Sequence, residues 1–179
     1  MILTKDGILQ AIETGDIQIK PFNIEQVNPN SYDVTIAPKL AVYTDLILDC
    51  KKKNSSIEIV IPDSGYILQP GRVYIGHTNE YTETRNLVPT LFGKSSLGRL
   101  GLHIHITTGL GDVGFCGQWV LELVATQPLK IYPNMKIAQL VYNEVSGNAD
   151  TKYNGKYINQ TGNHTSDYHK NFNADSNEP

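Results

Sequence analysis

The segment from Gly93 to Arg99, GKSSLGR, combines residue types that bind phosphate. It holds two hydroxyls and two cations within six residues, and its glycines would let backbone N–H groups approach oxygen atoms closely. Its GKS core occurs in P-loops, but that motif requires glycine at position 88, where this chain has Val88. We therefore reject a P-loop and keep two interpretations, a phosphate-binding turn and an ordinary turn.

Glu122 is the only charged residue in the apolar segment from Trp119 to Val124. In a strand its side chain would lie on the face opposite Trp119, because side chains alternate. If that face is closed to water, the carboxyl suits proton transfer near neutral pH. If the face is solvated, Glu122 is an ordinary surface residue. Alternation alone does not decide between the two.

Polar residues also gather just before this strand. His103 and His105 alternate with isoleucines and share one face of the expected strand. Such a pair could bind a metal, but no third ligand is evident, so we favour histidines of a polar or interface surface. Asp112 lies between glycines in a loop, where a carboxylate either faces a ligand or stabilises a turn.

The segment from Tyr153 to Gln160 is polar and aromatic and contains a glycine. It either covers a ligand or connects the fold to a tail. From Asn159 onward the chain is almost free of aliphatic residues, so this part builds no core of its own. We expect residues 161–179 to be a disordered tail or a flap that orders over a bound ligand.

Short strands must position these residues. Ile8, Leu9 and Ile12 predict a helix over residues 4–14 that ends at Gly15. After it the apolar period shifts toward two, and turn signals recur about every 10 residues, which predicts an all-β barrel or jelly roll. We expect strands at residues 16–20, 32–36, 40–43, 57–61, 73–77, 102–108, 118–126 and 136–145.

Composition excludes several classes of function. The chain has 179 residues, which fits one domain or one domain with a tail, and its net charge of -3 disfavours non-specific nucleic-acid binding. No apolar run approaches the roughly 18 residues of a membrane span, and the N-terminus lacks a signal-peptide core. Cys50 and Cys116 form no CxxC unit, so we expect no cysteine-based zinc site. We expect a soluble cytoplasmic protein that binds neither nucleic acid nor a membrane.

Taken together, these segments resemble the dCTP deaminase branch of the dCTP deaminase and dUTPase superfamily, from Met1 to about Gln160. The matching segments occur in the family's order and spacing. They are the N-terminal helix followed by GDIQI, then NSYDV, LQPG, GKSSLGRLGL, GDVGFCGQWVLEL and PNMKIAQL.

The resemblance implies a mainly β fold of the dUTPase-like type, a distorted β-barrel or jelly roll with a short N-terminal helix. Residues 1–160 would form the nucleotide-binding domain, and residues 161–179 a polar tail that is a possible active-site lid. The family assembles as a homotrimer with active sites shared between subunits. The implied reaction is hydrolytic deamination of dCTP to dUTP and ammonia, with Mg²⁺ on the triphosphate, no zinc, and dTTP as a possible inhibitor.

Residue by residue, the resemblance assigns roles to positions of this chain. Glu122 aligns with the catalytic glutamate, which takes a proton from water and returns it to the leaving amino group. Ser95 and Arg99 align with residues that position the water and polarise the site. The aligned substrate contacts are Lys94, Ser95, Ser96 and Arg99 at the phosphates, Asp112 at the sugar, Val120 and Leu121 at the base, and Tyr153, Lys156 and Gln160 in the closing segment.

Departures from the family pattern leave alternatives open. Lys94 replaces the usual arginine, so a point charge replaces a bidentate fork. Gly111-Asp112-Val113-Gly114 replaces the common Ile-Asp-Pro-Gly, and Ser166-Asp167 replaces the common Ser-Arg. We predict simple deamination to dUTP. The alternatives are a bifunctional enzyme that yields dUMP and pyrophosphate, with Asp112 orienting a second water, a dUTPase alone, and a non-catalytic deoxynucleotide-binding regulatory protein.

Overall fold

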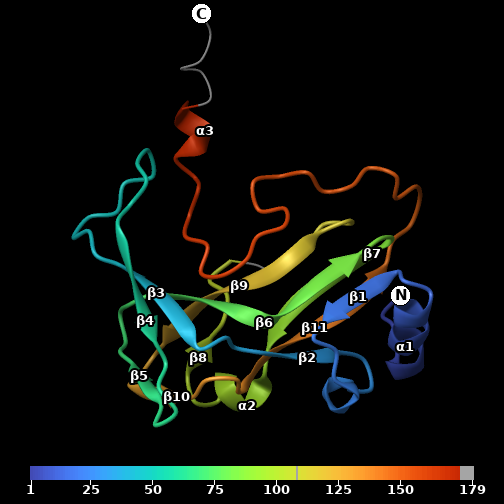
Figure 1. Ribbon diagram of the computed structural model, residues 1–179, viewed down its shortest axis with the longest axis horizontal. Coiled ribbons are helices and arrows are strands. Elements are labelled where there is room, and N and C mark those ends of the chain that lie inside the picture. The colour runs from blue at the N-terminus through green and yellow to red at the C-terminus, as the bar shows by residue number, and fades with distance from the viewer. Residues whose placement is uncertain (108, 174–179) are drawn as a thin grey trace, which may run out of the picture.

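The computed structural model describes residues 1–107 and 109–173, and its regular structure is mainly β (Figure 1). The helices are α1 (Lys5–Glu13), α2 (Ser95–Gly98), α3 (Lys170–Asn173) and a 3-10 turn, η1 (Ile24–Gln26). The strands are β1 (Ile17–Lys20), β2 (Tyr32–Thr35), β3 (Lys39–Tyr43), β4 (Ser56–Val60), β5 (Tyr66–Leu68), β6 (Tyr74–Thr84), β7 (Leu87–Gly93), β8 (Leu102–His103), β9 (Cys116–Ala125), β10 (Leu129–Ile131) and β11 (Lys136–Glu144). The expected mainly β fold with a short N-terminal helix is confirmed.

Helix α1 forms where the apolar spacing predicted it. Thr4 is its N-cap and accepts a hydrogen bond from the Gly7 N–H at 3.4 Å. Ile8 and Ala11 are buried against the sheets. Gly15 follows the helix with a φ of 78°, a left-handed conformation that glycine adopts without strain, and so the chain turns directly into β1.

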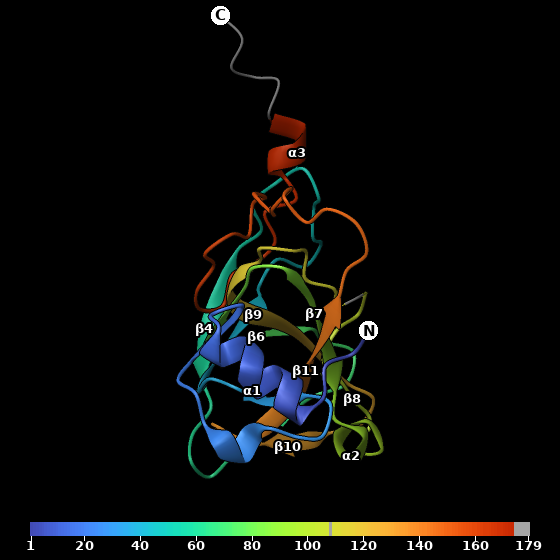
Figure 2. The same ribbon diagram turned by 90° about the vertical axis from the view of Figure 1, so that its right-hand side faces the viewer.

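The strands form three antiparallel sheets that surround one core (Figures 1 and 2). The largest has the order β4-β3-β6-β9-β8, with β1 also paired to β6. A second sheet has the order β2-β11-β7, and β5 pairs with β10. In both views α2 lies at the lower end of the molecule, and α3 and the segment before it lie at the upper end. Helix α2 and the C-terminal segment therefore lie at opposite ends of the barrel.

Strand β9 resolves the orientation that alternation left open. Trp119, Leu121 and Leu123 are buried in the core, and Leu121 and Leu123 are both 0% exposed. Val120 and Glu122 therefore lie on the other face of the strand, where they are half-buried. That face borders a cavity and is neither core nor open solvent.

Several elements differ from the sequence expectation. Strand β7 was not among the expected strands. It contains Pro89, which cannot donate to a ladder, but β7 is at the edge of its three-stranded sheet, where proline is tolerated. Strands β5 and β10 were also not expected, and at three residues each they are too short to show a period. The strand expected at residues 102–108 ends at His103, and residue 108 lies outside the described residues.

The segment after β11 crosses the upper end of the molecule and reaches α3. The Ser166 N–H donates to the Tyr43 hydroxyl at 2.9 Å, and Asn163 Oδ1 lies 2.6 Å from His77 Nδ1. Of the polar tail expected at residues 161–179, the part around Asn163 and Ser166 is thus held against the barrel, and α3 projects beyond it. Residues 174–179 lie outside the described part. In the described residues no helix is long and apolar enough to cross a membrane.

Candidate active site

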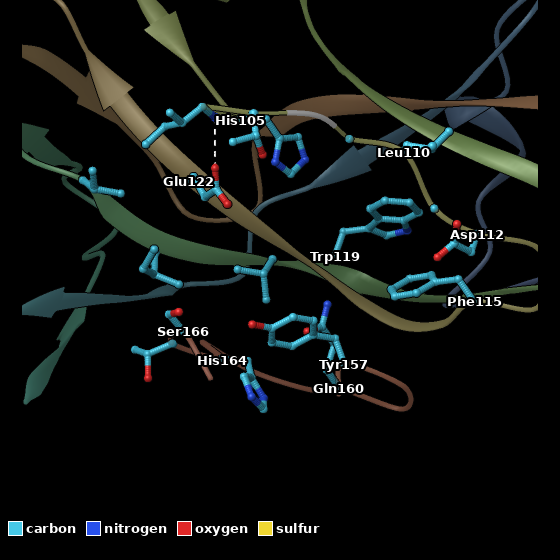
Figure 3. Close-up of a pocket in the computed structure, with 18 of the residues that line it drawn as sticks. His105, Leu110, Asp112, Phe115, Trp119, Glu122, Tyr157, Gln160, His164 and Ser166 are labelled. Carbon is cyan, nitrogen blue, oxygen red and sulfur yellow. Dashed lines mark hydrogen bonds between the residues drawn. The ribbon is translucent and has the colours of Figure 1, made fainter. Parts of the chain in front are cut away.

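A cavity of about 540 Å³ opens between β9, the loop that precedes it and the C-terminal segment (Figure 3). Strand β9 contributes Val120 and Glu122 to its wall. The loop contributes His105, Ile106 and the stretch from Gly109 to Asp112. Further lining residues are Tyr43, Val73, Ile75, Thr107, Phe115, Trp119, Tyr153, Tyr157, Gln160, His164, Thr165 and Ser166.

Two backbone hydrogen bonds from the neighbouring segment, at Ile104 and Ile106, hold Glu122 in the cavity wall. Its Oε2 accepts a hydrogen bond from the Ile106 N–H at 2.9 Å, drawn as the dashed line in Figure 3. Its own N–H donates to the Ile104 carbonyl at 2.8 Å. A carboxylate oriented by a backbone donor and facing a cavity is arranged for proton transfer to or from a bound ligand.

His105 lies beside Glu122 (Figure 3). Burial lowers the pKa of His105, although the nearby charge of Glu122 opposes this shift. The imidazole is therefore neutral at neutral pH. Its Nε2 is buried and has no hydrogen-bond partner within the described ranges, so it offers the cavity a polar atom.

Asp112 and an aromatic wall form the far side of the cavity (Figure 3). Asp112 is exposed, and its carbonyl accepts from the Phe115 N–H at 3.0 Å in a tight turn. Phe115 packs against Trp119 with ring centroids 4.8 Å apart and against Tyr153 at 6.1 Å. Such a wall suits a flat ring or the carbon face of a sugar, with a carboxylate at its edge.

The C-terminal segment covers the cavity and is tied to the barrel. Gln160 pairs with β9 through its carbonyl, which accepts from the Gln118 N–H at 2.9 Å. His164 packs edge-on to Tyr157, with centroids 5.5 Å apart, and hydrogen-bonds Asp167 at 3.1 Å. The cavity therefore has a polar cover made by the same chain.

The GKSSLGR segment lies elsewhere. Ser95, Ser96 and Arg99 are exposed on and beside α2 and do not line the cavity. Lys94 Nζ binds the buried carboxylate of Asp33 at 2.5 Å. In both ribbon views α2 is at the opposite end from the C-terminal cover, so one chain does not bring these residues to Glu122.

The structure brings together only part of the expected site. Glu122, Asp112, Val120, Tyr153 and Gln160 all line the cavity. The Leu121 side chain points into the core, so only its backbone is available on the cavity side. Lys156 Nζ binds Asn171 Oδ1 at 2.5 Å and does not line the cavity.

Sequence reasoning missed several lining residues. His105 was singled out, but as a residue of a polar surface, and only the tertiary fold places it beside Glu122. Tyr157 and His164 lie in segments that were expected to cover a ligand, but neither was named as a site residue. Tyr43 carries no sequence signal, because it comes from a strand that meets the site only when the chain is folded.

Comparisons with known proteins identify the family of this chain. Residues 2–145 match the dCTP deaminase-like family. The chain is 47% identical over 172 residues to the "dCTP deaminase, dUMP-forming" of Clostridium botulinum strain Eklund 17B, covering 96% of this chain and 99% of the relative. It is 50% identical over 147 residues to the enzyme with the same name from Hathewaya histolytica, covering 82% and 86%. The chain belongs to the dCTP deaminase-like family.

A solved structure supports the fold. The 2'-deoxycytidine 5'-triphosphate deaminase from Agrobacterium tumefaciens superposes with a TM-score of 0.63 at 18% identity, covering 80% of this chain. The match spans 48% of that solved chain, so this protein corresponds to about half of its length.

The family membership confirms the resemblance found in the sequence and the prediction of a hydrolase of the dCTP deaminase type. The prediction of dUTP as the product was wrong. The relatives that match this chain over nearly its whole length are dUMP-forming deaminases. In the sequence, the replacement of the usual arginine by Lys94 was interpreted as a sign of weaker phosphate binding. The names of these relatives instead indicate that their product is dUMP.

Proposed function

We propose that this protein converts dCTP and two water molecules into dUMP, ammonia and pyrophosphate. The observation that carries the proposal is that Glu122 and Asp112 face one cavity, in a chain whose near full-length relatives are dUMP-forming deaminases. Two hydrolytic steps need two carboxylates that reach two different parts of one nucleotide. A cavity of about 540 Å³ is large enough for a ligand of that size.

In the first step Glu122 acts as general base and then as general acid. It takes a proton from water, and the water oxygen forms a bond to C4 of cytosine while the electron pair of the C4–N3 double bond passes to N3. Glu122 then delivers this proton to the exocyclic amino group. The electron pair of the remaining O–H bond forms the C4=O bond as the exocyclic C4–N bond breaks and ammonia leaves, and the hydroxyl proton passes to N3, whose negative charge it neutralises. The backbone donor at Ile106 keeps the carboxylate in one orientation during both transfers.

In the second step Asp112 orients the other water toward the α-phosphorus. The water oxygen bonds to phosphorus, and the bond between this phosphorus and the bridging oxygen breaks, so pyrophosphate leaves with that electron pair. The water proton passes to Asp112 and from there to solvent, since this carboxylate is exposed. The aromatic wall of Phe115 and Trp119 lies between the two carboxylates and suits the sugar and base (Figure 3).

Magnesium enters with the triphosphate as part of the substrate. In the described ranges no group of three or more His, Cys, Asp or Glu side chains is arranged to hold a metal ion. The carboxylate of Asp112 at the cavity edge fits a cation that is held mainly by phosphate oxygens, as Mg²⁺ is when it binds through one or two carboxylates. Bound there, Mg²⁺ would neutralise charge on the phosphates.

A homotrimer with shared sites completes the machinery. Ser95 and Arg99 are exposed at the end of the barrel away from the cavity cover, so they are free to serve the cavity of an adjoining subunit. Their hydroxyl and guanidinium would orient the first water and bind phosphate there. Because dTTP shares the deoxyribose and triphosphate of dCTP, we place it as an inhibitor competing for the same cavity.

Product analysis with dCTP and Mg²⁺ tests the proposal. Purified protein should release one pyrophosphate for each ammonia and accumulate dUMP. E122Q should lose ammonia release by about 100-fold or more and still bind dCTP, because Gln retains an acceptor for the Ile106 N–H. E13Q, which alters an exposed glutamate of α1, is the matched control and should keep full activity.

Two results would overturn the proposal. If dUTP were the final nucleotide product, the second step would be absent. If E122Q kept its turnover, Glu122 would not be the proton carrier. Mixing inactive E122Q with inactive R99A protein, followed by subunit exchange, tests the shared site. Restored activity is expected, and its absence in mixed oligomers would refute a site that takes Glu122 from one subunit and Arg99 from another.

A further inference from the structure

We propose that Trp119 is a positioning residue for the second hydrolytic step, and that it acts through its contact with Gly111 to hold Asp112 in place. The inference rests on the proposed role of Asp112. It concerns an indole that touches the backbone next to the carboxylate and adds no group to the chemistry itself.

Gly111 lies in a slot that has no room for a side chain. A Cβ at this position would be 2.7 Å from Trp119 Cη2, 2.9 Å from Pro89 Cγ and 3.2 Å from the Pro89 carbonyl oxygen. The reason for glycine is space and not backbone conformation, because Gly111 is not among the glycines with positive φ. The Gly111 N–H also donates to the Pro89 carbonyl at 2.8 Å. Gly111 is therefore clamped between the edge strand β7 and the indole.

The indole is itself fixed from two directions. Trp119 Nε1 donates to Thr82 Oγ1 at 2.9 Å, and Trp119 is 5% exposed. The backbone N–H of Trp119 donates to Thr78 Oγ1 at 3.0 Å, at the point where the β6–β9 register shifts between His77 and Tyr81. Trp119 is therefore held through its backbone and through its indole nitrogen, and a buried ring fixed in this way is a rigid support for the backbone of Gly111.

Asp112 follows Gly111 directly in the chain. The contacts of Gly111 with Trp119 and Pro89 therefore fix the position of the Asp112 backbone, from which its carboxylate extends. On the other side of Asp112 its carbonyl accepts from the Phe115 N–H at 3.0 Å, and Phe115 packs on the same indole at 4.8 Å. The Asp112 turn is thus attached to Trp119 at both ends (Figure 3). Glu122 has a separate support, the Ile106 N–H. A disturbance at Gly111 should therefore affect the two steps unequally.

The test is the ratio of pyrophosphate to ammonia released from saturating dCTP. G111A forces the Asp112 turn or the indole to move, and a displacement of about 1 Å in a catalytic group lowers a rate by up to roughly 100-fold. We expect pyrophosphate release to fall by about 10- to 100-fold, ammonia release to stay within about 3-fold, and dUTP to accumulate. G7A in α1 is the control glycine variant and should keep a ratio of one.

A double variant separates positioning from general damage. W119F removes the ring atom that a Cβ at position 111 would strike, so G111A/W119F should accumulate less dUTP than G111A. W119F alone should accumulate some dUTP, because the Asp112 turn loses its support. A merely destabilised enzyme would lose both products in proportion and keep the ratio at one. If G111A does not fold, W119F alone decides the matter by the same ratio.

The outcomes distinguish this inference from the function on which it rests. D112N should accumulate dUTP. If it instead keeps one pyrophosphate per ammonia, the role of Asp112 is wrong. If D112N accumulates dUTP but G111A, or W119F in its place, keeps a ratio of one, the role of Asp112 stands and the positioning by Trp119 is refuted. Equal dUTP accumulation in G111A and G111A/W119F also refutes it.

Discussion

Asp33 on β2 connects the GKSSLGR segment to the barrel, and its replacement by asparagine tests how that segment is held. The Asp33 side chain is 3% exposed and lies 2.5 Å from Lys94 Nζ and 3.2 Å from Lys136 Nζ. Asn28 Nδ2 donates to it at 2.9 Å. Burial raises the pKa of Asp33, but the hydrogen bonds from Lys94, Lys136 and Asn28 outweigh it and hold the pKa below its usual 3.8.

The magnitude follows from the exposure of each partner. A hydrogen bond to a charged group contributes about 1.5–3 kcal/mol, and the short contact with the three-quarters buried Lys94 belongs in that range. Lys136 is 46% exposed, so solvent screening reduces its share to about 0.5–1 kcal/mol. We therefore expect D33N to lower the free energy of unfolding by about 2–4 kcal/mol, or Tm by roughly 4–16 °C.

Thermal unfolding of both proteins at equal protomer concentration between pH 7 and pH 2.5 is the assay. Because folding lowers the pKa of Asp33, its stabilisation is fully present above its unfolded value and is lost as pH falls through the folded value. The difference between the two proteins should therefore be constant near neutrality and shrink below pH 3.8. D63N, which alters an exposed aspartate, is the control and should match the parent.

A loss of less than about 0.5 kcal/mol in the free energy of unfolding of D33N at pH 7 would refute this role of Asp33, since a buried ion pair would then contribute no more than a surface pair. A difference in Tm between the two proteins that persists unchanged at pH 2.5 would refute it as well. Asp33 would then act through packing and not through its charge.

Three further perturbations follow from local geometry. G101A should lose about 1–3 kcal/mol in urea unfolding, because Gly101 has a φ of 83° and a Cβ would collide with the Thr126 hydroxyl; an unchanged midpoint would contradict this. Y43F removes the acceptor of the Ser166 N–H and should speed hydrogen exchange in residues 162–168 by about 2- to 10-fold. Protection equal to the parent would show that this bond does not hold the cover. G7A should raise stability by about 0.5–1 kcal/mol, since a Cβ there meets its nearest atom at 3.4 Å inside α1, and a lowered Tm would refute it.

Local rules were sufficient for much of the scaffold. The helix over residues 4–14 and most strands follow from apolar period, which acts between near neighbours in the chain. The sequence Gln69-Pro70-Gly71 is likewise typical of a type II turn, because proline fixes φ at its second position and glycine accepts a positive φ at its third. Gly71 has the left-handed φ of 75° that the turn needs. Strand β7 escaped these rules because its tolerance of Pro89 depends on its place at a sheet edge, which is a property of the whole sheet.

The sequence by itself determined the family and the individual chemical groups, since motif order and residue type are written along the chain. Only the tertiary structure decided which groups meet. It turned Glu122 toward the cavity, placed His105 beside it, and separated both from Ser95 and Arg99. The physical reason is that a strand's alternation has two equivalent faces, and only long-range packing of β9 against β6 and the core assigns one of them to the cavity.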